Sequence, residues 1–71
     1  MIDRVAIIGL GLIGGSLSMA AKESKLCKVV VGVPHREETL NVALKRGIID
    51  EGTLDPIEGV AGADLIFVCT P

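Results

Sequence analysis

The sequence contains one phenylalanine and neither tryptophan nor tyrosine among its 71 residues. Any core must therefore be built from aliphatic side chains, which the sequence supplies as Val, Ile, Leu and Ala. A chain this short buries only about 60% of the surface that it exposes when unfolded, so it has marginal stability alone. We expect these residues to be one part of a larger domain.

A strong charge of one sign is also lacking. The seven Lys and Arg residues are scattered, and the formal net charge is −2. Binding to nucleic-acid phosphates requires a basic face, so no nucleic-acid partner is expected. No apolar run approaches the roughly 20 residues of a membrane span, and the first residues lead into a predicted strand without a signal-peptide cleavage site. We therefore expect a cytoplasmic protein with no membrane partner.

The two cysteines lack the spacing of a redox or metal motif. Cys27 and Cys69 form neither a CxxC pair nor a cluster with histidines. Buried thiols of this kind pack as small apolar groups. We interpret both as inert and expect no metal site.

Three apolar, β-branched segments predict strands at residues 4–8, 28–33 and 65–69. Each is apolar on both faces, which is typical of buried strands in a parallel sheet covered by helices on both sides. Helices are predicted between them, at residues 13–24 and 37–46. The predicted buried faces are Ile13, Leu17, Ala20, Ala21 and Ser24 in the first helix, with Lys22 and Glu23 outward, and Leu40, Ala43 and Leu44 in the second.

Helix ends are marked by specific residues. Gly47 suits a left-handed C-cap of the second helix, and Glu37 and Glu38 suit the positive end of its dipole. Asp55 and Pro56 predict the N-cap and first turn of a third, short helix. The element order is therefore β-α-β-α-link-α-β, which predicts one α/β unit with a parallel sheet.

Residues 9–14 match the pattern G-x-G-x-x-G, directly after the first predicted strand and directly before the first helix. Gly9 permits a tight turn, Gly11 lets a pyrophosphate approach the backbone, and Gly14 lets the helix approach the sheet. The free N–H groups at the helix start, with Leu12 and Ile13, then face the anion. The context predicts the N-terminal portion of a Rossmann-type dinucleotide-binding domain spanning residues 1–71.

The residues of this loop have alternative interpretations. The glycines can serve only close packing at a strand-helix corner. Ser16 can contact a phosphate or satisfy a backbone N–H group of the helix start. A lysine-containing phosphate loop, G-x-x-x-x-G-K-[ST], is excluded because the lysine is missing.

The residues after the second strand indicate which dinucleotide is bound. NAD-preferring domains place an Asp or Glu about 20 residues past the glycine loop, where this sequence has Pro34, His35 and Arg36. Arg36, helped by His35, is predicted to contact the 2′-phosphate of NADP, with NAD as the alternative cofactor. Glu37 and Glu38 weaken the local positive field. A solvated Arg36 and an exposed loop His35 are the alternatives without a ligand.

Residues 5–17 resemble the start of the prephenate and arogenate dehydrogenases. Further segments agree with that family in order and spacing, at residues 37–40, 43–44, 47–50 and 64–71. The resemblance implies an enzyme of tyrosine biosynthesis, in which prephenate or arogenate loses hydride to a nicotinamide cofactor and releases carbon dioxide. It also implies a homodimer of the full-length protein, with the substrate and dimerisation domain outside this chain.

The resemblance further implies that the last strand lies beside the first. Cys69, Thr70 and Pro71 would then line the cofactor near its nicotinamide ribose, although Thr70 and Pro71 can also form a plain turn. The catalytic histidine and arginine of the family lie beyond residue 71, so no catalytic residue is assigned. Alternative functions are a β-hydroxyacid or imine oxidoreductase and a non-catalytic nucleotide-sensing module.

Overall fold

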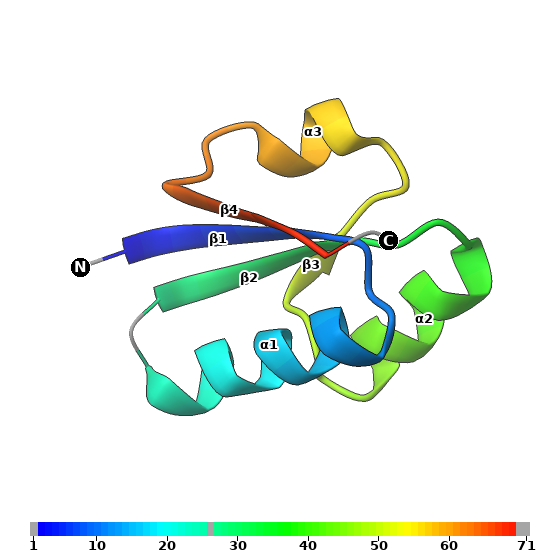
Figure 1. The fold of residues 1–71 in the computed structure, drawn as a ribbon, viewed down its shortest axis with the longest axis horizontal. Coiled ribbons are helices and arrows are strands. Elements are labelled where there is room, and N and C mark those ends of the chain that lie inside the picture. The colour runs from blue at the N-terminus through cyan, green and yellow to red at the C-terminus, as the bar shows by residue number, and fades with distance from the viewer. Residues whose placement is uncertain (1, 26, 70–71) are drawn as a thin grey trace.

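The computed structural model describes residues 2–25 and 27–69, without the side chains of Leu12 and Ile13. Four parallel strands form one sheet in the order β3-β2-β1-β4 (Figure 1). Helices α1 and α2 cover one face and α3 covers the other (Figure 1), which confirms the Rossmann-type α/β fold. The elements are β1 (Ile2–Ile8), α1 (Leu12–Ser24), β2 (Cys27–Val33), α2 (Glu37–Lys45), β3 (Glu51–Gly52), α3 (Pro56–Val60) and β4 (Leu65–Val68).

Strand β1 lies at the centre of the sheet. Its residue Val5 is paired with Val30 of β2 on one side and with Leu65 of β4 on the other, so the predicted neighbour of the first strand is confirmed. The chain moves outward from β1 to β3 and then returns across β1 to β4. This reversal creates a topological switch point at the carboxyl ends of β1 and β4, where α/β sheets bind ligands.

The core is aliphatic, as the composition predicts. Its buried side chains are Val5, Ile7, Val30, Ala43 and Ile49. Ile49 comes from the link after α2, and a Cβ atom on Gly32 would lie only 2.8 Å from the side chains of Ile49 and Leu10. Glycine in β2 therefore lets the link and the glycine loop pack on the same strand.

The predicted face of α1 was partly wrong. Ser18 is fully buried, and its hydroxyl donates to the Gly14 carbonyl at 2.9 Å. This bond to the preceding helical turn satisfies the hydroxyl, so a polar side chain can be buried there. Leu17 and Ala21 are partly buried, whereas the predicted Ala20 and Ser24 are exposed.

Helix α2 ends with the predicted glycine cap. Gly47 has a φ of +71°, and its N–H donates to the carbonyl of Leu44, while the Ile48 N–H donates to Ala43. This pair of bonds is a Schellman motif. Ala43 is buried, as predicted, but Leu44 is 40% exposed, contrary to the prediction. Helix α2 packs near the edge of the sheet, where strand β3 has only two residues and covers little of the helix.

Two features of the sheet differ from the prediction. Strand β3 was assigned to the link, because two residues show no periodicity from which a strand can be predicted. Strand β4 was predicted as buried, yet Ile66 and Val68 are 45% and 67% exposed, because β4 is an edge strand of the four-stranded sheet.

The cap of α3 is confirmed, since the Asp55 carboxylate accepts a 2.9 Å hydrogen bond from the Ile57 N–H. Among the described residues, no helix has the length and apolar character needed to cross a membrane.

Candidate functional site

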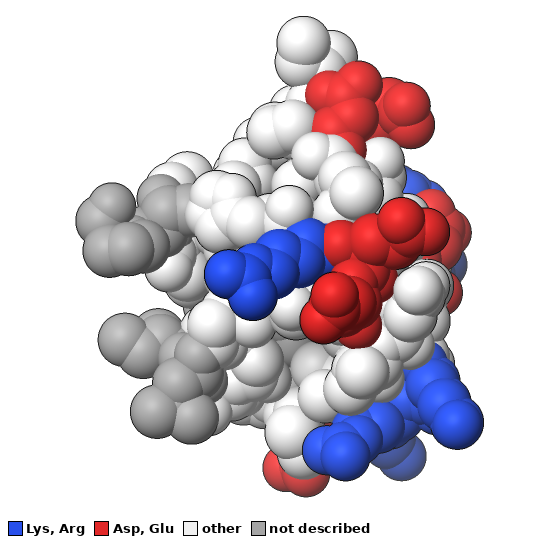
Figure 2. Space-filling model, turned by 90° about the vertical axis from the view of Figure 1, so that its right-hand side faces the viewer, with Lys and Arg blue, Asp and Glu red and all other residues white. Residues whose placement is uncertain are grey.

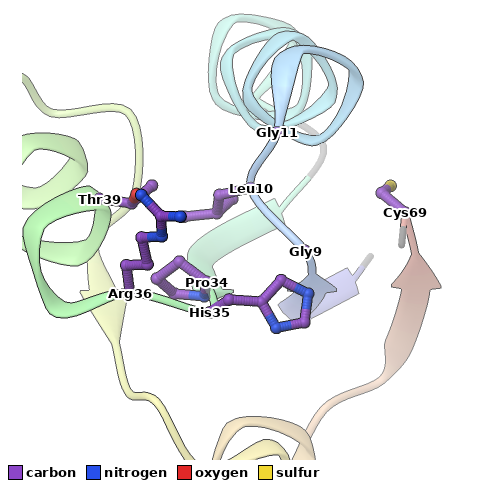
Figure 3. A pocket seen from close by; sticks show the side chains of 8 residues that line it. All are labelled: Gly9, Leu10, Gly11, Pro34, His35, Arg36, Thr39 and Cys69. Carbon is purple, nitrogen blue, oxygen red and sulfur yellow. The ribbon is translucent and has the colours of Figure 1, made fainter. Parts of the chain in front are cut away.

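A cavity of about 310 Å³ lies at the carboxyl edge of the sheet (Figure 3). It is lined by residues 9–11, residues 34–36, Thr39 and Cys69. The cavity thus brings together residues from the glycine loop, the turn after β2 and the end of β4, which are far apart in sequence. The predicted positions Thr70 and Pro71 lie outside the described residues.

Gly9 turns the chain away from β1. It has a φ of +89°, a region that side chains disfavour, and its N–H donates to the Val33 carbonyl at 2.8 Å. On the other side of β1, the Cys69 N–H donates to the Ile8 carbonyl at 2.8 Å. The turn is therefore held between the ends of β2 and β4.

Gly14 allows the start of α1 to contact this turn. A Cβ atom at Gly14 would overlap the carbonyl oxygen of Gly9, and it would lie 3.6 Å from the Cβ atom of Cys69. The close approach of helix and loop thus requires glycine at position 14.

Gly11 has no comparable structural requirement. It is the N-cap of α1 with a φ of −73°, and no side chain caps the helix there. A Cβ atom at Gly11 would meet no atom within 4 Å among the described residues. The first N–H groups of a helix lack intrahelical acceptors. Glycine therefore adds no side chain between the cavity and the start of α1, and the side chains of the predicted residues Leu12 and Ile13 lie outside the described part of the structure.

The turn after β2 contributes a cation to the cavity. Arg36 is the N-cap of α2, and it forms none of the salt bridges found within residues 2–25 and 27–69. Its side chain extends toward Leu10 and Thr39, whereas that of His35 points to the opposite side, near Gly9 (Figure 3). Figure 2, which faces the carboxyl edge of the sheet, shows basic and acidic side chains next to one another.

Thr39 was missed by the sequence analysis. It is partly buried, lines the same cavity as Arg36 and follows it by three residues. Residues three apart lie on one side of a helix, so this spacing from Arg36 was the available signal. The hydroxyl of Thr39 offers a second hydrogen-bonding group on the Arg36 side of the cavity.

The carboxylate of Asp64 is hydrogen-bonded to the backbone of β1 at the amino end of the sheet. Oδ2 of Asp64 accepts 3.0 Å hydrogen bonds from the backbone N–H groups of Arg4 and Asp3. These bonds favour the charged carboxylate, and they lower the pKa of Asp64. Asp64 precedes β4 and contacts the start of β1, at the end of the sheet opposite to the cavity, so its role is structural.

Asp50 joins three elements. Its Oδ1 accepts a 2.9 Å hydrogen bond from Lys22 of α1, and its Oδ2 accepts a 2.8 Å bond from the Val30 N–H of β2. Burial raises the pKa of Asp50, but the bonds from Lys22 and Val30 outweigh this effect and the pKa lies below its ordinary value. Lys22, predicted to point outward, is therefore partly buried in a salt bridge.

Both cysteines are free and only partly buried, which corrects the prediction of buried thiols. Cys69 lines the cavity at the end of β4, whereas Cys27 starts β2. Within the described part of the chain, no group of three His, Cys, Asp or Glu residues is arranged to hold a metal ion.

No family model matches the chain, but individual proteins are similar to it. A prephenate dehydrogenase of Bacillus subtilis is 38% identical over 71 residues, which cover all of the chain and 19% of that protein. A prephenate dehydrogenase of Lactococcus lactis subsp. cremoris is 40% identical over 68 residues, covering 96% of the chain and 19% of that protein.

Solved structures agree with the sequence comparison. Prephenate dehydrogenase from A. aeolicus, in complex with hydroxyphenyl propionate and NAD+, has a TM-score of 0.89 at 28% identity, covering all of the chain and 25% of that structure. Synechocystis arogenate dehydrogenase has a TM-score of 0.86 at 32% identity, covering 96% of the chain and 23% of that structure. The predicted resemblance is thus confirmed: the chain is similar along its length to prephenate and arogenate dehydrogenases, and it spans about a fifth to a quarter of them.

Proposed function

We propose that this chain forms the phosphate- and adenosine-binding part of a nicotinamide dinucleotide site, in a dehydrogenase that oxidises prephenate or arogenate. The observation that carries the proposal is the geometry of Gly11. Neither its backbone angles nor a neighbouring described atom requires glycine there, and the residue lines the cavity beside the start of α1. A close approach by a ligand explains a glycine in this position.

The ligand class follows from the helix start. Unpaired N–H groups and the positive end of the helix dipole favour an anion. The cavity continues from Gly11 to Arg36, so it suits a molecule with a central pyrophosphate and a second group that reaches the turn after β2. A dinucleotide has this shape, and the similar A. aeolicus structure holds NAD+.

Residues 1–71 would bind and orient the cofactor. When bound, the nicotinamide accepts hydride from the substrate. In this proposal Gly9, Gly11 and Gly14 place the pyrophosphate, and Cys69 lies beside the cofactor at the end of β4. Residues outside this chain would hold the substrate and complete the site.

We further propose a preference for NADP. No carboxylate lines the cavity within the described residues, whereas Arg36 and Thr39 lie together on one side of it. A carboxylate at the turn after β2 would hold the ribose 2′-hydroxyl of NAD, and an Arg accommodates a 2′-phosphate. Glu37 and Glu38 follow in sequence but form no salt bridge with Arg36 in the described structure.

The test is an assay of the full-length protein with prephenate and with arogenate, each combined with NAD+ and with NADP+. We expect reduced cofactor to form with one of the two substrates, at a higher kcat/KM with NADP+. Turnover of a β-hydroxyacid or an imine instead would support the proposed dinucleotide site but refute the proposed substrate. Dinucleotide binding without any turnover would indicate a sensing module.

A further inference from the structure

His35 and Arg36 are adjacent in sequence but lie on different sides of the cavity (Figure 3). The backbone at Arg36 is extended, with a φ of −121° and a ψ of 143°, and in extended chain successive side chains point in opposite directions. Pro34, which precedes both, is buried. The backbone before α2 therefore separates the two side chains.

The side of the cavity near His35 carries no Lys, Arg, Asp or Glu side chain among the described lining residues. It is formed by Gly9, Pro34 and, across the end of β1, Cys69 (Figure 3). Gly9 adds no side chain, and the imidazole ring of His35 is exposed. A flat, uncharged ring fits these surroundings better than a phosphate does, because aromatic faces stack on heterocycles.

We propose that His35 stacks against the adenine ring of the dinucleotide, and that it has no part in binding a 2′-phosphate. This inference rests on the proposed function, and it divides the adenosine end into two independent contacts. Arg36 and Thr39 distinguish NADP from NAD, whereas His35 strengthens the binding of both cofactors equally. The proposal replaces the sequence-based prediction that His35 helps Arg36 to contact the 2′-phosphate.

The experiment measures dissociation constants of NADH, NADPH and reduced nicotinamide mononucleotide, which lacks adenosine, in the full-length protein. The variants are His35→Ala and His35→Phe, the second retaining a flat aromatic ring without the ring nitrogens. Loss of one stacking contact with a base corresponds to roughly a ten-fold increase in the dissociation constant. We expect His35→Ala to weaken the binding of NADH and of NADPH by about this factor, and His35→Phe to restore both affinities. The affinity for the mononucleotide should be the same in all variants.

Other outcomes overturn the inference in distinguishable ways. If His35→Ala weakens the binding of NADPH much more than that of NADH, His35 contacts the 2′-phosphate. Unchanged affinities for both dinucleotides in His35→Ala show that His35 is a bystander. Failure of the unmodified protein to bind either dinucleotide refutes the proposed function itself, and this inference with it. Thermal unfolding of each variant checks that the exposed position leaves the fold intact.

Discussion

The carbonyl oxygen of Gly9 occupies the space that a Cβ atom of Gly14 would need. This contact joins the turn that follows β1 to the first turn of α1, across the glycine loop. Because the neighbouring atom is backbone, it cannot move aside as a flexible side chain would. The position of the helix start relative to the sheet therefore depends on glycine at position 14.

A Gly14→Ala substitution should displace the start of α1. We expect a loss of about 1–3 kcal/mol in the free energy of unfolding, the usual cost of overpacking, together with weaker dinucleotide binding. Gly15→Ala is the matched control, because a Cβ atom at Gly15 meets no described atom within 4 Å and alanine favours helix by up to about 1 kcal/mol. Equal stability of the two variants in urea unfolding would contradict the assigned contact.

Gly11→Ala should separate stability from binding. The backbone at Gly11 has a φ that any residue adopts, and its Cβ position is open, so we expect the free energy of unfolding to fall by no more than about 1 kcal/mol, the cost of alanine at an N-cap. Dinucleotide affinity should fall by about ten-fold or more, because the added methyl group would hold the pyrophosphate away from the helix start. Unchanged affinity in a titration would remove the main support for the proposed site.

Arg36→Ala should reduce discrimination between the two cofactors. One charge-assisted hydrogen bond contributes about 1.5–3 kcal/mol, so NADPH should bind about ten-fold or more weakly while NADH is little affected. Thr39→Ala should have the same selectivity and a smaller effect, since it removes a neutral group. Arg46→Ala at the far end of α2 is the charge-matched control. An equal loss of NADH and NADPH in the Arg36 variant would make Arg36 structural.

Asp64 should make the protein sensitive to acid. Its pKa is lowered in the folded state, chiefly by the N–H groups of Arg4 and Asp3, so its contribution to stability is complete above the ordinary value of 3.8 and disappears as pH falls through the folded pKa. Asp64→Asn retains an oxygen that can accept both bonds, and it should flatten this acid dependence. Asp64→Ala should lower the unfolding temperature at neutral pH as well. An unchanged pH profile in Asp64→Asn would show that other groups govern acid unfolding.

The two contacts of Asp50 should differ in strength. Its salt bridge with Lys22 is partly exposed, and such pairs contribute about 0.2–1 kcal/mol. The bond from the partly buried Val30 N–H to the charged carboxylate is worth about 1.5–3 kcal/mol. We therefore expect Asp50→Ala to destabilise the protein more than Lys22→Met in urea unfolding. Equal losses would mean that the salt bridge dominates.

Features that depend on a few neighbouring residues were predictable from the sequence. The turn at Gly9, the left-handed cap at Gly47 and the side-chain cap at Asp55 each follow from local backbone geometry and from hydrogen bonds within a few residues. The parallel fold also followed, because strands alternate with helices and are apolar on both faces. The glycine spacing located the loop that borders the cavity.

The tertiary structure alone decided contacts between distant residues. Burial of Ser18 and exposure of Val68 depend on which surfaces the sheet covers, and no local pattern contains that information. The sequence placed His35 and Arg36 in one turn but did not show that their side chains part. The spacing of Thr39 from Arg36 is visible in the sequence, but only the packing of α2 beside the glycine loop brings that side of the helix to the cavity. Local hydrogen bonding thus determined the loop and caps, whereas packing between elements decided which side chains share the cavity.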